Sequence, residues 1–543
     1  MIRALGFFFF ILFIASCSPS DQDDGRTVFR YNESAGITSL DPAFSRNLEN
    51  MWAVNQLFDG LVVLDSSMRV QPHIAKQWSI SEDGLTYSFT IRNDVHFHDH
   101  EVFAEGRGRL VVAADFVYSF NRIMSEQVAS PGQWIFNKVD FDSGGFQAPN
   151  DSTLTVQLKE TFPPFLSILS MQYCNVVPRE IVEHYGADFR ANPIGTGPFK
   201  FAFWYEGVAL VYHKSESYWE TDASGNALPY LDAIKIDFVR DMNNEFHGLV
   251  KGDYHFMSGI NPEYKDELLD PAGDLSAAYN DIIRFQRTPF LKTDYIGILV
   301  DTSLTLSSTH PLSDPKLRRA LNLGLNRADM VRYLRNNAVI PADHGFVPKG
   351  LPSFELTSGT GYSYDPTMAS QLMEEAGYPG GKGLPEIALS TTSDYVDLCE
   401  FMQHEWEKLG FKISIDVLPS SVHRQNVSES KLLMFRKSWL ADYADEENFL
   451  GLFYSGNFCP GGPNYTHFSS AEFDPLFELA ASETNDSLRL DMYSKLDSIV
   501  VAESPVIPLF YDQVSHFVRK EVEGLPTNPI NMLDLRKTRI NRN

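Results

Sequence analysis

Hydrophobic and polar positions along the chain follow two periods, one typical of strands and the other of helices. Residues 84–98 alternate apolar and polar side chains, which predicts a half-buried strand. Residues 113–124 carry apolar side chains on one helical face, which predicts an amphipathic helix. Residues 386–418 run in the order strand, helix, strand and so predict one β-α-β unit.

Glycine and proline mark the ends of the predicted elements. A helix within residues 50–64 is expected to close at Gly60 and to be followed by a short strand. Further helices are expected to begin at Pro315 and Pro366, each directly after an aspartate. A late helix precedes the apolar strand 505–513. The chain is therefore predicted to be a mixed α/β protein.

The N-terminal segment has the layout of a secretory signal: Arg3, a short apolar run, and small residues before Cys17. Residues 14–17 resemble a bacterial lipobox, in which cleavage exposes the cysteine for acylation. The alternative is a plain signal peptide with an incidental cysteine. We expect a signal peptide over 1–16 and lipidation at Cys17. Residues 17–26 are polar and are expected to form a lipidated tether.

Length and charge narrow the class of protein. The 543 residues are 43% hydrophobic, enough for more than one core. A net charge of −26 argues against a nucleic-acid partner. Beyond Cys17 the cysteines are Cys174, Cys399 and Cys459, an odd number without CxxC spacing. They predict neither a disulfide framework nor a zinc site; one disulfide is possible, and no pair is predicted.

Enzyme motifs are absent from the sequence. It contains no G-x-S-x-G elbow, and the glycine-rich stretch 379–383 lacks the spacing and ending of a phosphate loop. On a strand, His96, His98 and His100 would share a face and could hold nickel, copper or zinc. The alternative is a strand that runs into an exposed turn, with its histidines solvated, and we expect that one. No metal and no cofactor are predicted.

One stretch, residues 438–450 (SWLADYADEENFL), places four carboxylates among apolar and aromatic side chains. A solvated acidic loop needs no aromatic neighbours, and a core strand does not favour acids. The acids are Asp442, Asp445, Glu446 and Glu447; their apolar neighbours are Trp439, Leu440, Tyr443, Phe449 and Leu450.

Six stretches follow one another along the chain: QPHIAKQWSISEDGLTYSFTIRNDVHFHD, VVAADFVYSFNRIM, NPIGTGPFKF, DPKLRRALNLGLNR, YDPTMASQLMEEAGYPGG and ADYADEENFL. In this order they resemble the landmarks of the extracellular solute-binding proteins, family 5, the peptide/nickel group of ABC-transporter receptors. Two places depart from the family: residues 100–110 are inserted or rebuilt, and a common Asp-Pro is Asp445-Glu446 here.

The resemblance implies a two-lobed periplasmic-binding-protein fold of type II, with an extra subdomain in the first lobe. Strands near 293–301 and 505–513 would cross between the lobes, which close on a ligand by hinge motion. The implied boundaries are lobe 1 over 27–293 with an inserted subdomain at about 55–188, lobe 2 over 294–505, and a return to lobe 1 over 506–543.

The resemblance also implies a ligand site. Asp442 would take the ammonium group of a peptide, and Arg436 would meet its carboxylate. Asn464 would bind the peptide backbone, and the remaining acids would lie on a solvated turn or helix start. A helix N-cap for Asp442 and a salt bridge for Arg436 are the alternatives. The aromatic and apolar frame of the pocket would come from Trp439, Leu440 and Tyr443.

The implied function is a monomeric, lipid-anchored receptor of the cell envelope. It would capture short peptides and deliver them to the permease subunits of an ABC importer, without catalysis. The same fold accepts nickel or other metal chelates, oligosaccharides and opine-like amines, so these ligands stay open. A secreted hydrolase is the alternative from another class.

Overall fold

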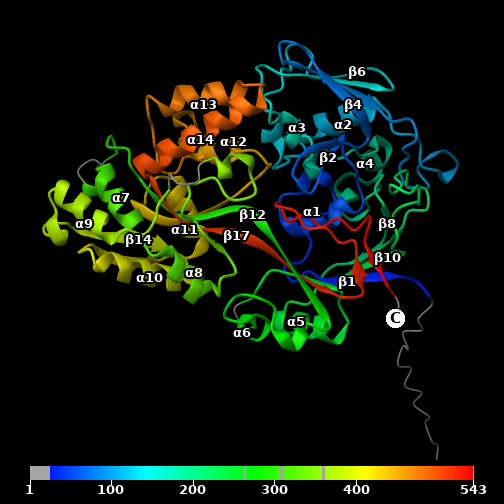
Figure 1. The fold of residues 1–543 in the computed structure, drawn as a ribbon. Helices are drawn as coiled ribbons and strands as arrows, with labels where there is room; N and C mark the ends of the chain where they lie inside the picture. The colour runs from blue at the N-terminus through cyan, green and yellow to red at the C-terminus, as the bar shows by residue number, and fades with distance from the viewer. Residues whose placement is uncertain (1–24, 262–263, 305–309, 357–360, 542–543) are drawn as a thin grey trace, which may run out of the picture.

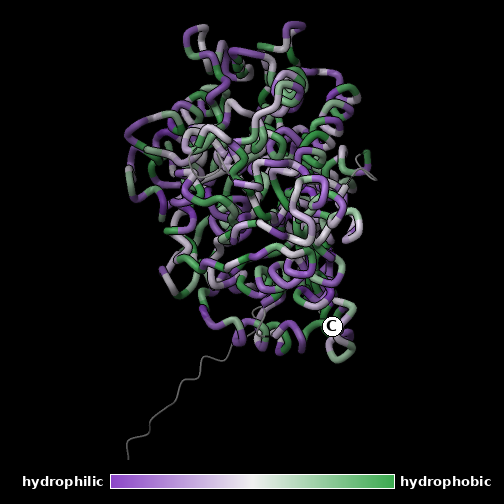
Figure 2. Tube along the Cα trace, turned by 90° about the vertical axis from the view of Figure 1, so that its left-hand side faces the viewer, coloured by the Kyte–Doolittle hydropathy of each residue, from purple (hydrophilic) through white to green (hydrophobic). Residues whose placement is uncertain are grey.

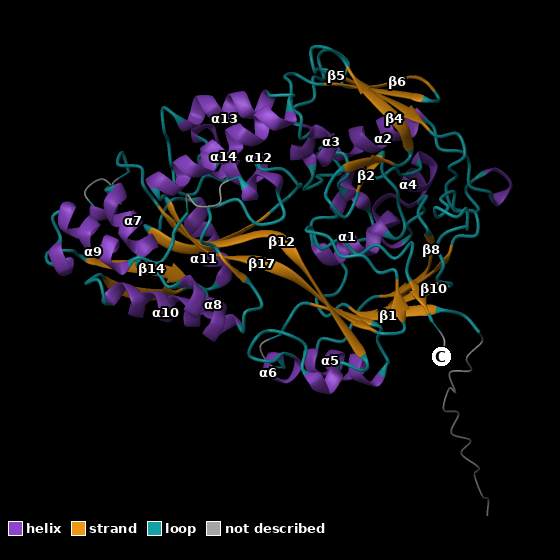
Figure 3. Cartoon of the chain, viewed as in Figure 1, coloured by secondary structure: helices purple, strands orange, loops and turns teal. Residues whose placement is uncertain are grey.

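The computed structural model describes residues 25–261, 264–304, 310–356 and 361–541, so the predicted signal and Cys17 lie outside the described residues. Figure 3 shows helices and strands intermixed throughout, as the hydrophobic pattern predicts.

The helices are α1 Leu48–Asn55, α2 Ala113–Met124, α3 Phe165–Ile168, α4 Arg179–Tyr185, α5 Met242–Lys251, α6 Lys265–Leu268, α7 Pro315–Leu323, α8 Arg327–Arg335, α9 Pro366–Glu375, α10 Val396–Glu407, α11 Ser420–Ser428, α12 Glu447–Leu450, α13 Phe473–Ser482 and α14 Asp486–Glu503.

The strands are β1 Val28–Asn32, β2 Val62–Leu64, β3 Val70–Pro72, β4 Ala75–Ile80, β5 Thr86–Ile91, β6 Phe146–Asn150, β7 Thr153–Gln157, β8 Phe199–Tyr205, β9 Ala209–Lys214, β10 Ala233–Asp237, β11 Phe256–Ser258, β12 Ile283–Ile298, β13 Ile340–Pro341, β14 Glu386–Thr391, β15 Lys412–Val417, β16 Met434–Leu440, β17 Val506–Arg519, β18 Val522–Glu523 and β19 Arg539–Ile540.

One long sheet runs through both halves of the molecule, in the order β15-β14-β16-β12-β17-β11-β1-β10-β9-β8, with β13 paired to β17. Figure 1 shows β12 and β17 running between a group of elements that contains α1 to α4 and a group that contains α7 to α14. We name these groups the first and the second lobe. The strands expected to cross between the lobes are thus found, but both extend further into the first lobe than predicted.

The antiparallel pair β12–β17 holds both lobes in register. Its pairing runs from Ile283 opposite Arg519 to Gly297 opposite Val506, and shifts between Pro289 and Thr293. A bulge bends the bulged strand and increases its twist, so the ribbon changes direction where it leaves one lobe for the other.

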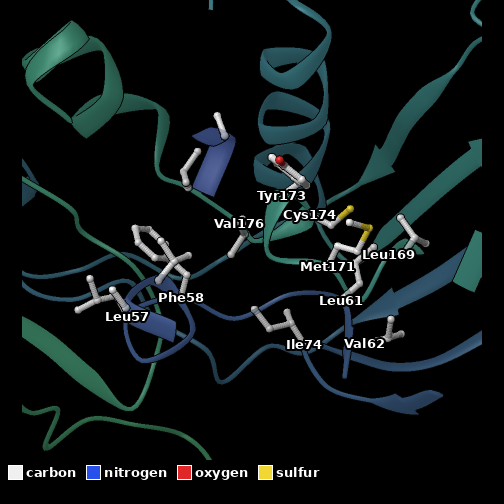
Figure 4. Packing of buried hydrophobic residues seen from close by; sticks show 14 of the residues in the cluster. Leu57, Phe58, Leu61, Val62, Ile74, Leu169, Met171, Tyr173, Cys174 and Val176 are labelled. Carbon is white, nitrogen blue, oxygen red and sulfur yellow. The ribbon is translucent and has the colours of Figure 1, made fainter. Parts of the chain in front are cut away.

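The first lobe has one large core. It joins β1, α1, α2 and the four-stranded sheet β4-β5-β7-β6, and strand β5 alternates buried and exposed side chains as predicted. Figure 4 shows part of this core around Leu57, Ile74 and Val176. The segment after β17 returns to this lobe, where Trp52 Nε1 donates to the Asn531 carbonyl at 2.6 Å.

The second lobe has two cores, one around Trp406 and one around Phe346. The predicted β-α-β unit is confirmed as β14, α10 and β15, with β14 and β15 parallel. The predicted helix starts are also confirmed, since α7 begins at Pro315 and α9 at Pro366. In both helices the preceding aspartate accepts a hydrogen bond from a first-turn backbone N–H. The numerical lobe boundaries given above stay predictions.

Two predictions of local structure are wrong. Helix α1 ends at Asn55, well before Gly60, because residues 56–57 pair with another segment: Gly197 N–H donates to the Leu57 carbonyl at 2.9 Å. The segment His96–His100 forms only an isolated bridge and not a strand. There His96 is exposed while His98 is buried, so the histidines do not share one face.

Apolar residues are spread along the whole trace (Figure 2). None of the helices in the described ranges is both long and apolar enough to cross a bilayer. Among the described residues, Cys174, Cys399 and Cys459 are buried free thiols, so they form no disulfide.

Candidate functional site

The candidate site begins where β16 ends. Strand β16 pairs with β12 up to Leu440 opposite Lys292, and the next residue, Ala441, donates its N–H to the Leu291 carbonyl at 2.9 Å. Beyond this point the chain turns, and Asn448 of α12 holds the turn. Its Oδ1 accepts from the Asp442 backbone N–H at 3.2 Å and from Trp439 Nε1 at 3.0 Å. The pairing of β16 with β12 therefore determines where Asp442 lies.

Asp442 combines solvent exposure with a desolvated carboxyl group. The residue is exposed to solvent, yet desolvation by the surrounding protein raises the pKa of its carboxyl to about 6. A hydrogen bond from Asn448 and the charge of Arg46 lower the pKa only in part. A carboxylate on a convex surface would not be desolvated in this way. We infer that Asp442 lines an open cleft.

Two side chains next to Asp442, those of Tyr443 and Leu440, differ in their exposure to solvent. Tyr443 is buried and packs into the core of the first lobe, with its ring centroid 6.2 Å from that of Trp134. Leu440 is 46% exposed and points to solvent. Tyr443, a residue of the second lobe, therefore packs directly against the first lobe.

The other acids of the stretch lie at a helix start, as one of the two expectations had it, since α12 begins at Glu447, but they are not solvated. Asp445 and Glu446 are buried. Asp445 accepts from Arg489 Nη1 at 2.6 Å, and Glu446 accepts from the Ser353 backbone N–H at 2.8 Å. Desolvation raises the pKa of Glu446 to about 7.

Glu447 accepts a hydrogen bond from the Tyr443 hydroxyl. Desolvation also raises its pKa to about 7. The ion pair of Asp445, the hydrogen bonds of Glu446 and Glu447 and the raised pKa values of these two acids thus reduce the repulsion among the three carboxyl groups. Solvation was expected to relieve that repulsion.

Arg436 lies inside the protein rather than at the cleft surface. It forms an ion pair with Asp294, and both residues are buried. Its guanidinium stacks on Tyr395, 3.1 Å from the ring centroid, while Lys292 lies 3.3 Å from the second oxygen of Asp294. This arrangement is the salt-bridge alternative for Arg436, formed within one sheet. Because Asp294 already neutralises the guanidinium, Arg436 has little charge left to attract a ligand carboxylate.

Asn464 is also turned inward. It is fully buried, and its Nδ2 donates to the carbonyls of Tyr454 at 3.0 Å and Phe468 at 2.9 Å. Its Oδ1 accepts from the Phe468 N–H and the Thr466 hydroxyl. The amide therefore braces its own loop.

Sequence reasoning missed three residues close to Asp442. Arg46 is exposed in the loop before α1, and its charge acts on both Asp442 and Tyr173. Tyr465 also feels the charge of Asp442, and Lys437 Nζ lies 4.2 Å from the Tyr465 ring centroid. Arg46 and Tyr465 belong to segments separated from Asp442 in sequence, so no local motif signals them.

The histidine segment does not form a metal site. Buried His98 contacts the Gly197 carbonyl through Nε2 at 2.8 Å, and His100 contacts the Tyr185 hydroxyl at 3.0 Å. Burial lowers the pKa of His98 to about 4. Within the described ranges, no group of three or more histidine, cysteine or acidic side chains could hold a metal ion.

A separate cavity of about 610 Å³ lies in the first lobe, between the hairpin β2–β3 and the returning C-terminal segment. Its most buried cation, Arg536, pairs with Asp534 at 2.5 Å and with Glu220 at 2.9 Å. Asp442 is not part of its lining. We place the candidate site at Asp442 because the resemblance assigns the ligand ammonium to this residue.

Two α/β lobes joined by crossing strands have the architecture of a two-lobed binding protein. Residues 69–458 match the sequence profile described as bacterial extracellular solute-binding proteins, family 5 Middle, and the chain belongs to this family. Members of this family are extracytoplasmic binding proteins, and the two-lobed fold class predicted from the sequence is confirmed.

Three similar proteins illustrate the match. The dipeptide-binding protein DppE of Bacillus subtilis (strain 168) is 26% identical, covering 95% of this chain and 92% of its own. The structure of HbpA2 from Haemophilus parasuis matches with a TM-score of 0.80 at 21% identity, covering 95% and 100%. The binding protein DppA from Helicobacter pylori, in complex with the peptide STSA, matches with a TM-score of 0.74 at 22% identity, covering 95% and 99%.

The buried ion pair generates the first prediction. Arg436→Met should lower the free energy of unfolding by about 3 kcal/mol, because Asp294 keeps its buried charge but loses its closest partner. The double variant Asp294→Asn/Arg436→Met should recover part of this loss. Urea denaturation monitored by circular dichroism measures both.

Arg424→Met is the matched control, because Arg424 is exposed on the nearby helix α11. It should change stability by less than about 0.5 kcal/mol. An Arg436→Met protein as stable as the wild type, but with weakened ligand binding, would contradict the structural role.

Proposed function

We propose that this protein captures short peptides between its two lobes and delivers them to the permease of an ABC importer. The observation that carries the proposal is Asp442, a solvent-accessible carboxylate whose pKa desolvation raises to about 6. A charge held in such a place is costly until an opposite charge joins it. The α-ammonium group of a peptide supplies that charge.

Arg46 supplies the second half of the proposed site. It belongs to the first lobe, lies within the electrostatic reach of Asp442, and is exposed. No salt bridge involves its side chain in the described part of the chain. A ligand with an ammonium group at one end and a carboxylate at the other would engage Asp442 and Arg46 together. Such a ligand would link the lobes, which favours the closed state.

Several features support a peptide over the other ligands of this fold. The relatives described above include a dipeptide-binding protein and a binding protein in complex with a peptide. A bare metal ion finds no ligand cluster among the described side chains. The matched family and the structural neighbours are binding proteins, which argues against a hydrolase.

The proposal includes the membrane anchor. A lipid on Cys17, followed by the polar tether 17–26, would keep the receptor close to its permease in the cell envelope. A monomer suffices, because both halves of the proposed site belong to one chain.

Asp442→Asn should weaken the binding of a free peptide by roughly tens- to thousands-fold, because removing one member of a buried charge pair typically costs about 2–5 kcal/mol. A peptide acetylated at its N-terminus has no ammonium group. Wild type should bind it poorly, and the variant should discriminate far less. Isothermal titration calorimetry of both proteins with both peptides measures the coupling between Asp442 and the ammonium group.

The pH dependence provides a control on the same pair. Because the pKa of Asp442 is about 6, its carboxylate is charged above that pH and becomes neutral below it. Affinity for the free peptide should therefore fall as the pH drops through about 6, approaching a tenfold loss per pH unit. Asp442→Asn should lack this dependence. If Asp442→Asn lowered the affinity for free and acetylated peptides equally, Asp442 would only support the wall of the site and would not contact the ammonium group.

Arg46→Gln should weaken the binding of a peptide with a free C-terminal carboxylate by roughly ten- to a hundredfold, the value of a charge-assisted hydrogen bond. It should leave the binding of the corresponding C-terminal amide almost unchanged. Arg69→Gln is the matched control, since the Arg69 side chain is 76% exposed on the hairpin β2–β3. An equal loss for acid and amide would exclude Arg46 as the carboxylate partner.

A further inference from the structure

A thiol, an imidazole and a carboxylate lie close together in the second lobe, and the proposed binding uses none of them. Cys459 Sγ lies 3.3 Å from His467 Nε2, and His467 Nδ1 lies 3.5 Å from Asp301 Oδ2. The Ser430 hydroxyl contacts both partners, at 3.2 Å from Sγ and 2.9 Å from Nε2. Three separate segments of the chain therefore bring one nucleophile and its base together.

The surrounding fold holds the imidazole in place. The ring of Phe458 stacks on that of His467, with centroids 4.6 Å apart and planes 6° from parallel. The loop that carries both is braced by Asn464, as described above, and its Thr466 carbonyl accepts from the Val300 N–H at 2.9 Å. Ser430 and His467 both have positive φ angles, of 55° and 51°, a conformation that non-glycine residues rarely adopt.

The partners of His467 favour proton transfer from the thiol. Nδ1 faces the Asp301 carboxylate, and Nε2 lies 3.1 Å from the Cys459 carbonyl oxygen. Both groups are hydrogen-bond acceptors, and a neutral imidazole can donate to only one of them. Taking the Cys459 proton lets the ring donate from both nitrogens. The product is a thiolate next to an imidazolium, the arrangement that makes cysteines reactive.

The low solvent exposure of Cys459 limits which reagents can reach its sulfur. Cys459 is only 4% exposed, so a molecule little larger than water can approach its sulfur, whereas a peptide bond cannot. This argues against a cysteine peptidase and for a small oxidant.

We propose that Cys459 is a peroxide-reactive thiol, activated by His467 and Asp301. The thiolate sulfur forms a bond to one oxygen of hydrogen peroxide while the O–O bond breaks. Sulfur gives up two electrons and becomes a sulfenic acid. The departing hydroxide takes the proton from the His467 imidazolium and leaves as water.

The other two described thiols provide internal controls. Cys174 and Cys399 are fully buried, and burial raises the pKa of both, that of Cys399 to about 11. Neither has an imidazole among its hydrogen-bond partners in the described ranges. Differences in reactivity between these thiols and Cys459 therefore report the local chemistry within one folded protein.

The test treats the full-length native protein with hydrogen peroxide in the presence of dimedone, which traps sulfenic acids. Peptide mapping by mass spectrometry then assigns the label to each cysteine, Cys17 included. We expect Cys459 to be labelled at least about tenfold faster than Cys399 or Cys174. Equal labelling of the three, or an unlabelled Cys459, would overturn the proposal.

Two variants test the activation itself. His467→Gln and Asp301→Asn should each slow the labelling of Cys459, the first by roughly tenfold or more. Asp301→Asn lies at the more exposed end of the cluster and keeps the hydrogen-bonding shape. His404→Gln, an exposed histidine on α10, is the control and should label like the wild type. Wild-type labelling rates in both Asp301→Asn and a folded His467→Gln protein would disprove the role of the imidazole.

Discussion

The antiparallel pairing of β12 with β17 is the constraint on which the rest of the structure depends. The two strands carry backbone hydrogen bonds from the core of the first lobe to those of the second, with a bulge between Pro289 and Thr293. Strand β16 takes its register from β12, and the turn that presents Asp442 begins where that pairing stops. Any change in the twist of this ribbon would therefore move Asp442 and the first lobe relative to each other, which is the motion that a solute-binding protein requires.

Charge compensation then determines what the cleft can do. Arg436 lies in the segment that precedes the cleft turn, yet Asp294 already neutralises it inside the sheet. Asp445 is likewise matched by Arg489. Asp442 on the second lobe and Arg46 on the first lobe are both exposed. In the proposed site they would offer one charge of each sign, which would suit a small zwitterion better than a metal ion or a neutral sugar.

Local patterns were enough to predict much of the fold and only part of the site. Helix starts at Pro315 and Pro366 were predictable because their caps are local in sequence. The burial of Glu446 was not, since its partner is the backbone of Ser353. A motif proposes which residues meet a ligand, but it does not reveal which of them another segment has already neutralised. Arg46 acts on Asp442 from a distant segment, and His467 meets Asp301 in the same way, so only the structure brings these residues together.

Contacts across the cleft are modest in energy, and this leaves control of closure to the solute. The aromatic pair Trp134–Tyr443 joins the two lobes beside Asp442. Such a pair contributes about 0.5–1.5 kcal/mol beyond its buried area. A desolvated charge pair with a ligand can contribute several times as much. Because a ligand shifts an equilibrium only by its differential affinity for the two states, a weak aromatic contact and a strong ionic one together make closure conditional on the bound charge. In the proposed mechanism the Tyr443 contact would favour closure, and the bound ligand would determine whether the lobes stay closed.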